Sequence, residues 1–103
     1  MQKPGATEGF PFDSNTLVFK AVKMFALTDV DSFRSVNLKC DPERAIELRE
    51  TYNGVQPGYH MSKVHWNTIT IDSDVPDPLI YDLIDHSYDL VVKSLTKRQR
   101  DEL

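Results

Sequence analysis

The sequence predicts a two-layer α+β fold, in which helices pack on one face of an antiparallel β-sheet. In three consecutive segments, 16–22, 24–30 and 34–40, apolar residues alternate with polar ones. This period of two indicates half-buried strands, and the short gaps between the segments favour antiparallel neighbours. Segment 77–95 instead carries apolar residues at helical spacing. An amphipathic helix that follows a run of strands is expected to cover one face of their sheet.

Size and composition predict one small globular domain that spans residues 1–103. Of the 103 residues, 40% are hydrophobic and 27% are charged. No apolar run approaches the ~20 residues that cross a bilayer, and the single cysteine, Cys40, cannot form an intramolecular disulfide. We therefore expect a cytoplasmic protein. The formal net charge of −4 means that DNA binding would require a local basic patch.

The N-terminal residues and the first hairpin give two further expectations. Residues 1–15 are expected to form a loop that packs Phe10 and Phe12 on the core, because Pro11 favours an extended chain. Alternation along the second strand predicts that Phe25 and Leu27 lie on the same face.

The helices have clear start signals. Asp41 can cap a helix that begins with Pro42 and ends near Tyr52, before Asn53-Gly54. We expect its inward side to comprise Ala45, Ile46, Leu48, Arg49 and Tyr52. A second helix begins at Asp77 or Pro78, and Thr96 caps a short helical turn over 97–103.

Segment 57–68 is the most distinctive part of the chain. It contains two of the three histidines and the only tryptophan, Trp66, and it leads into a strand over 65–71. Alternation places Asn67 and Ile69 on one face and Trp66 on the other. If the isoleucines face the helices, Trp66 lies on the outer face. There an exposed tryptophan would call for a partner, whereas a buried one would make the segment a structural lock.

Six blocks of this sequence resemble the MmcQ/YjbR family in the same order. They are Pro4–Glu8 with Phe10–Phe12, Lys23–Leu27, Leu38–Glu43, Pro57–Met61, His65–Thr68 and Asp85–Val91. The resemblance implies a small cytoplasmic bacterial protein with a fold like that of frataxin (CyaY), from a family often labelled DNA-binding. Family members usually carry an N-terminal helix before the first block, and this chain begins three residues before that block. Either this helix is absent from the protein, or the start of the sequence has been placed too late. Loss of the helix would uncover part of the sheet face, which a partner chain or a second copy could then cover.

Metal binding and catalysis find little support in the spacing of reactive residues. His60 and His65 lie across a loop-to-strand transition, and no cysteine pair accompanies them. Ser62 is not in a Gly-x-Ser-x-Gly elbow, and Cys40 lies on an apolar strand face. We expect no metal, no cofactor and no enzymatic activity. His86 is expected to bond or pair within its own helix, and its neighbours to orient Tyr88 against the sheet.

Two functions remain as alternatives. The first is DNA binding through a sheet and loop surface, since an aromatic ring beside basic groups suits bases and phosphates. The predicted surface comprises Tyr59, His60, Lys63, His65, Trp66 and Asn67, and the predicted phosphate contacts are Lys20, Lys23, Lys39, Lys97, Arg98 and Arg100. The second is a protein-interaction or adaptor domain, which would bind a partner or a second copy through the open sheet face and residues 59–66. A small-molecule pocket beside Trp66 is a third possibility.

Overall fold

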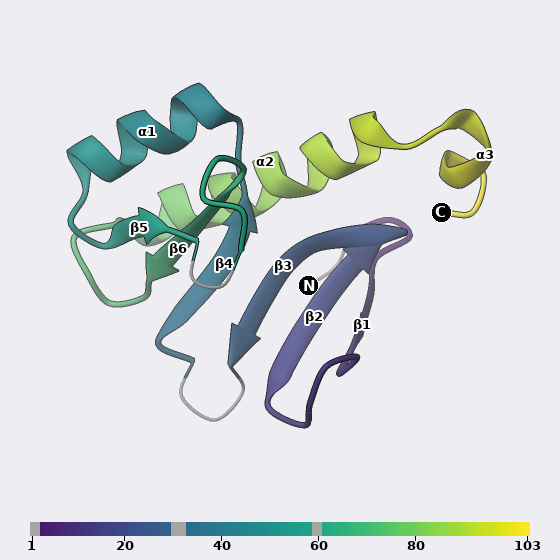
Figure 1. Ribbon diagram of the computed structural model, residues 1–103, viewed down its shortest axis with the longest axis horizontal. Helices are drawn as coiled ribbons and strands as arrows, with labels where there is room; N and C mark the ends of the chain where they lie inside the picture. The colour runs from purple at the N-terminus through teal and green to yellow at the C-terminus, as the bar shows by residue number, and fades with distance from the viewer. Residues whose placement is uncertain (1–2, 30–32, 59–60) are drawn as a thin grey trace.

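The computed structural model describes residues 3–29, 33–58 and 61–103. Figure 1 shows the arrangement of its elements. The strands are β1 (Thr7–Gly9), β2 (Thr16–Ala21), β3 (Lys23–Asp29), β4 (Ser35–Lys39), β5 (Val55–Pro57) and β6 (Trp66–Thr70), and the helices are α1 (Pro42–Thr51), α2 (Asp77–Ser94) and α3 (Lys97–Arg100).

The described strands form one sheet in the order β1-β2-β3-β4-β6-β5, and every neighbouring pair is antiparallel. Helix α1 packs against β5, and α2 packs mainly against β3 and β4. Buried residues of both helices belong to one core cluster on the same side of the sheet, and α2 passes behind the strands in Figure 1. We call this side the inner face and the opposite side the outer face. The predicted two-layer α+β class is confirmed.

A β-bulge in β3 changes which residues reach the inner face. Phe19 pairs with Ala26 but Lys20 pairs with Met24, so Phe25 is an extra residue in its strand. Phe25 and Ala26 are both buried in the inner core, whereas Leu27 packs on the outer face. The prediction that Phe25 and Leu27 share a face is therefore wrong, because the bulge shifts the alternation by one residue.

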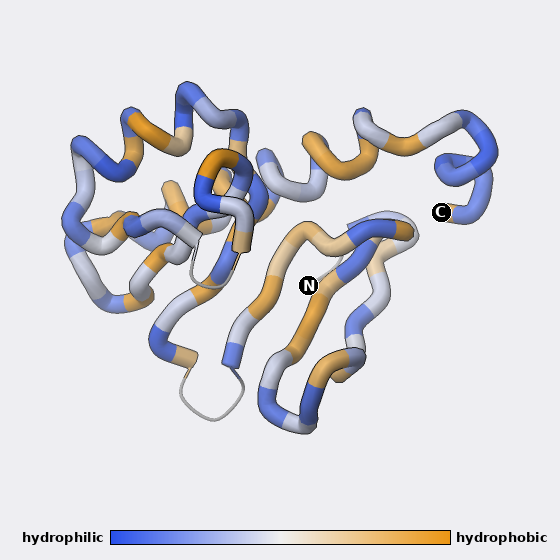
Figure 2. The backbone as a smooth tube through the Cα atoms, in the orientation of Figure 1, coloured by the Kyte–Doolittle hydropathy of each residue, from blue (hydrophilic) through white to orange (hydrophobic). Residues whose placement is uncertain are grey.

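The main core lies between the inner face and α2. Its largest fully buried side chains include Phe25, Leu38 and Ile69 from the sheet and Val91 from α2. The ring of Tyr88 meets Phe25 edge-on, with centroids 5.4 Å apart. Figure 2 shows the corresponding hydrophobic stretches on the central strands and on α2.

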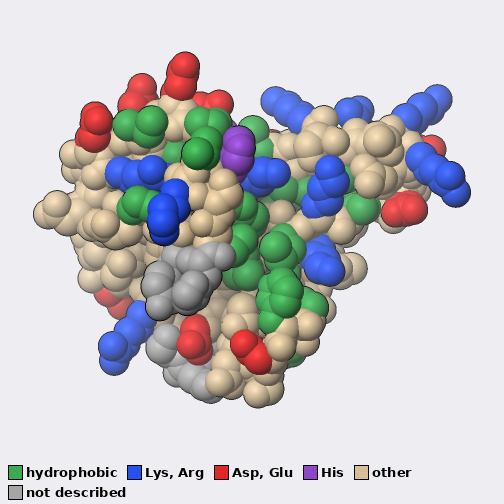
Figure 3. All heavy atoms as spheres, in the orientation of Figure 1, with side chains coloured by type: hydrophobic (Ala, Val, Ile, Leu, Met, Phe, Trp, Pro, Cys, Tyr) green, Lys and Arg blue, Asp and Glu red, His purple; other side chains and the backbone are tan. Residues whose placement is uncertain are grey.

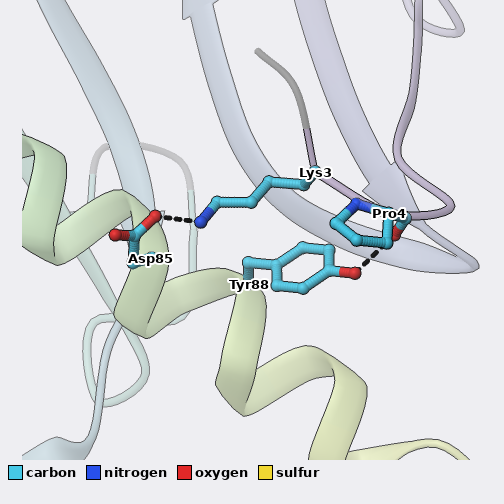
Figure 4. A network of polar contacts seen from close by, with 4 residues as sticks. All are labelled: Lys3, Pro4, Asp85 and Tyr88. Atoms are coloured by element: carbon cyan, nitrogen blue, oxygen red, sulfur yellow. Dashed lines mark hydrogen bonds and ion pairs between the residues drawn. The ribbon is translucent and has the colours of Figure 1, made fainter.

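The N-terminal segment is fixed to α2 through polar contacts rather than through its phenylalanines. Phe10 and Phe12 are 50% and 65% exposed, so their expected packing on the core is wrong. Instead, Lys3 pairs with Asp85, and the Tyr88 hydroxyl donates a hydrogen bond to the Pro4 carbonyl (Figure 4). These contacts hold the chain where it enters β1.

The predicted helix starts are correct. The Asp41 side chain accepts a hydrogen bond from the backbone N–H of Arg44 at 3.2 Å. Thr96 and Gln99 form a reciprocal capping box at the start of α3. On α1, however, Ile46 is 52% exposed and does not belong to the inward side.

Candidate functional site

A second hydrophobic cluster lies on the outer face of the sheet. Val18, Leu27 and Trp66 are buried there, and the partly buried side chains of Met24 and Met61 pack against them. The strand register brings these residues together, because Val18 pairs with Leu27 across β2 and β3. The outer face therefore has an apolar centre that no helix of the described chain covers.

Beside this cluster the outer face is hollowed into a cleft of about 570 Å³, which we call the outer cleft. Phe12 lines one side and Met61, from the loop before β6, lines another. The full lining is Phe12, Asp13, Thr16, Met24, Leu27, Thr28, Asp29, Ser35, Asn37 and Met61. In Figure 3, hydrophobic side chains form a band across this face of the molecule.

Arg49 of α1 holds the loop that carries Met61. Its Nε donates to Asn67 Oδ1 at 2.7 Å, and its terminal nitrogen donates to the carbonyls of Trp66, at 3.3 Å, and of Lys63. The loop also closes on itself, since the N–H of Gly58 donates to the Trp66 carbonyl at 2.8 Å. A side chain at Gly58 would approach the Trp66 Cβ within 2.7 Å, which only glycine avoids. Sequence reasoning placed Arg49 on the inward side of α1 but did not identify its partners.

Two residues of the predicted binding surface, Trp66 and Asn67, are buried. Trp66 lies on the outer face, as the alternation predicted, but it is only 7% exposed. Asn67 is 1% exposed and faces α1, where its Nδ2 donates to the Ala45 carbonyl. These two side chains therefore support the loop and present no exposed surface. Lys63 and His65 are exposed, while Tyr59 and His60 lie outside the described residues.

The predicted phosphate contacts divide into three groups. Lys20 is on the outer face, two residues after Val18 in β2, and Lys39 is paired with Trp66 on the same face. Lys23 pairs with the inward-facing Ala21 and lies at the end of the hairpin. The three remaining residues, Lys97, Arg98 and Arg100, are exposed on α3. Figure 3 shows Lys and Arg side chains beside the hydrophobic band and along the α3 side.

Two carboxylates line the outer cleft, at Asp13 and Asp29. The backbone N–H groups of Asn15 and Thr16 donate to Asp13 at 2.8 and 2.6 Å, and they lower the pKa of that carboxyl. Asp13 is thus charged at neutral pH. The cleft therefore combines apolar side chains, such as Phe12, Leu27 and Met61, with polar and acidic ones. Lys20 and Lys39 lie elsewhere on the same face.

Cys40, His86 and Ser87 have structural roles. Burial raises the pKa of the Cys40 thiol to about 11, so the nucleophilic thiolate is scarce at neutral pH. His86 Nε2 accepts a hydrogen bond from the backbone N–H of Asp41 at 3.2 Å. The expected contact within its own helix is therefore replaced by one between α2 and the start of α1. Burial, with the nearby charge of Arg44, lowers the pKa of His86.

Ser87 joins two strands where their ladder ends. Its hydroxyl accepts from the backbone N–H of Lys39 at 2.9 Å and donates to the Phe25 carbonyl. The predicted orientation of Tyr88 against the sheet is confirmed by its edge-on contact with Phe25. Among the residues that the structure describes, no three His, Cys, Asp or Glu side chains are grouped as metal ligands. None of the described helices combines the length and hydrophobicity that a membrane span requires.

The fold and the outer cleft define a small α+β domain with an open antiparallel sheet, one face of which is covered by helices and the other hollowed. The family model named YjbR matches residues 1–90, and the chain belongs to the YjbR family. The chain is 36% identical to the uncharacterised protein YjbR of Escherichia coli K12 over 102 residues, which cover 97% of this chain and 86% of that one. It is 46% identical to the uncharacterised protein YyaQ of Bacillus subtilis over 55 residues, or 53% and 46% of the two chains.

Solved structures of similar proteins support the same fold. The crystal structure of the Deinococcus radiodurans protein DR2400 is similar with a TM-score of 0.85 and 45% identity, over 94% of this chain and 76% of that one. A Pseudomonas syringae protein gives a TM-score of 0.71 at 26% identity, over 84% and 86% of the two chains. The resemblance to the YjbR family that the sequence blocks predicted is confirmed.

Proposed function

We propose that this chain is a non-catalytic domain that binds single-stranded DNA through the outer face of its sheet. One observation carries the proposal: Phe12, Met24 and Met61 line a cleft on the face to which Lys20 and Lys39 also belong. Apolar and aromatic side chains provide stacking surfaces for unpaired bases, and neighbouring lysines contact the phosphates. The cleft volume of about 570 Å³ leaves room for unstacked bases.

The distribution of charge supports this assignment in spite of the net charge of −4. Many of the acidic residues are on the helical layer, in α1 (Glu43, Glu47, Glu50) and α2 (Asp77, Asp82, Asp85, Asp89). That layer lies on the inner side of the sheet, whereas Lys20 and Lys39 are on the outer side. Because exposed charges more than about 10 Å apart are largely screened at 0.1 M salt, the local patch matters more than the total.

The two cleft carboxylates limit where the DNA backbone can lie. A phosphate near Asp13 or Asp29 would be repelled, so the DNA backbone is expected to follow Lys20 and Lys39 while bases enter the cleft. With few phosphate contacts, affinity should be weak, and log K should fall with log salt by only about 0.7 for each contacted phosphate.

Fluorescence anisotropy of a labelled oligonucleotide of about 15 nucleotides tests the proposal. We expect weak binding at about 50 mM salt, with a slope of log K against log salt near −0.7 for each contacted phosphate. Lys20→Gln and Lys39→Gln should each reduce affinity and make the slope about 0.7 shallower. Phe12→Ser should weaken binding by about tenfold, because an exposed stacking ring is worth roughly 1–3 kcal/mol.

Matched controls separate a specific surface from general charge. Arg44→Gln removes one positive charge from α1 on the helical layer, and it should leave the salt slope unchanged. Phe33→Ser removes a phenylalanine of similar exposure, 54% against 65% for Phe12, that does not line the outer cleft. No binding at about 50 mM salt with micromolar protein would refute the proposal, as would equal losses for the Phe12 and Phe33 variants.

A further inference from the structure

A second hollow lies on the outer face of the sheet, over the edge strand β1. Its volume is about 360 Å³, and we call it the edge hollow. Strand β1 pairs with β2 at one end of the sheet (Figure 1). In that pairing Gly9 is opposite Val18, which packs in the outer cluster. Thr7 and Lys20 pair two residues further along the ladder and therefore lie on the same face. The edge hollow is thus on the side of the sheet opposite to the helical layer.

The fold does not require glycine at position 9. The φ of Gly9 is not positive, and a Cβ added there would meet no atom of the described chain within 4 Å. A β-branched residue would suit the strand better, because glycine has no side chain to pack and loses more conformational freedom on folding. Glycine in a strand often marks a bulge, a sharp bend in a barrel, or a close approach by a ligand. The pairs between β1 and β2 are consecutive and the sheet is open, so a close approach is the explanation that fits.

An aromatic ring and a cation border the space above Gly9. Phe10 lines the hollow and is 50% exposed. Lys20 lines it from β2, and no carboxylate within the described ranges forms an ion pair with its ammonium group. Glu8 also belongs to the lining, but it pairs with Phe19, which packs against the inner core. Alternation therefore directs the Glu8 carboxylate to the inner side. An exposed ring beside a cation suits a base and its phosphate.

We propose that the edge hollow is a second base-binding subsite, which takes a neighbouring nucleotide of the strand whose base enters the outer cleft. This inference rests on the function proposed above and extends the site from one hollow to two. The hollows adjoin, since Val18 lines the edge hollow and its cross-strand partner Leu27 lines the outer cleft. Phe10 lines the first and Phe12 the second, and their Cα atoms are at most about 7 Å apart. One strand can therefore place a base against each ring, with a phosphate at Lys20.

Substitutions of Gly9 test the inference, because they fill the edge hollow without disturbing the packing of the chain. Gly9→Ala and Gly9→Val add side chains to empty space in a strand, so the thermal midpoint should be unchanged or higher. Affinity is measured by fluorescence anisotropy with a labelled thymidine oligonucleotide of about 15 nucleotides, at about 50 mM salt. Gly9→Val and Phe10→Ser should each weaken binding about fivefold or more, as loss of one stacked base does, and Gly9→Ala should have a smaller effect.

Controls separate this subsite from the outer cleft. Gln56→Val adds a β-branched side chain to β5, the strand at the other end of the sheet, and should leave affinity unchanged because Gln56 lines neither hollow. Unchanged affinity in Gly9→Val and Phe10→Ser, with weaker binding in Phe12→Ser, would overturn the edge subsite and leave the outer-cleft proposal standing. No binding by the unsubstituted chain would overturn both.

Two further outcomes would also count against the edge subsite. A lower thermal midpoint in Gly9→Ala would overturn it, because the glycine would then be required by the fold. A polyglutamate peptide that binds as tightly as the oligonucleotide, and is weakened equally by Gly9→Val, would show that the hollow accepts any acidic chain and would overturn the assignment to a nucleotide.

Discussion

Replacing Arg49 with methionine should release the loop that forms one side of the outer cleft. The variant keeps a side chain of similar length but removes the hydrogen bonds to Asn67 Oδ1 and to the carbonyls of Trp66 and Lys63. Asn67 is 1% exposed, so its oxygen would lose its partner without gaining water. A hydrogen bond from a charged donor contributes about 1.5–3 kcal/mol, and a buried unpaired acceptor costs about 1–3 kcal/mol. Because these contributions overlap, we expect a loss of about 2–4 kcal/mol in the free energy of unfolding.

Trp66 provides a direct assay, because it is the only tryptophan of the chain. Urea unfolding followed by its fluorescence should show a lower midpoint with an unchanged slope. In the native state, acrylamide should quench Trp66 more strongly in the variant, since the loop no longer packs over the ring. Arg44→Met, on the same helix, is the matched control and should change the stability by less than about 0.5 kcal/mol.

A double-mutant cycle separates the pair from its surroundings. When Arg49→Met and Asn67→Leu are combined, the decrease in the free energy of unfolding should be smaller than the sum of the two single decreases. The reason is that the double variant leaves neither partner of the buried hydrogen bond unpaired. Unchanged stability and quenching in Arg49→Met would refute the assignment of Arg49 as the anchor of the loop. Strict additivity in the cycle would refute the importance of the bond between Arg49 and Asn67.

Three further variants test the packing around this framework. Ser87→Ala should lower the free energy of unfolding by about 2–4 kcal/mol, because the Lys39 N–H and the Phe25 carbonyl lose the hydroxyl that they share. Ser94→Ala, at an exposed site of the same helix, should change it by less than about 0.5 kcal/mol. Equal effects of the two variants in chemical denaturation would contradict this prediction. The pKa of His86 is lowered in the folded chain, so as the pH falls the unfolded chain takes up a proton on this histidine before the folded chain does. The free energy of unfolding should therefore be level above pH ~6.5 and decrease below it. His86→Gln should flatten that part of the pH profile when it is measured by urea unfolding. Val22 has a φ of 66°, which is unfavourable for a β-branched residue. Val22→Asn should therefore raise the thermal midpoint by a few degrees, corresponding to about 0.5–1 kcal/mol. A lower thermal midpoint in the variant would show that the backbone at Val22 is not strained.

The elements that the sequence predicted are those with several turns or pleats of regular pattern. Strands β2 to β4 and helix α2 appear within one or two residues of their expected ends. The face of Trp66 was also correctly predicted, since alternation in β6 is regular. Asp41 and Thr96 predicted their helix starts because capping depends on residues three positions apart.

The sequence did not predict the features that depend on partners distant in the chain. Strands β1 and β5 have three residues each, too few to show a period, and they form only because β2 and β6 offer an edge. The bulge at Phe25 adds one residue, which nothing in the local composition marks. The burial of Trp66 likewise depends on Val18 and Leu27, which are far from it in sequence.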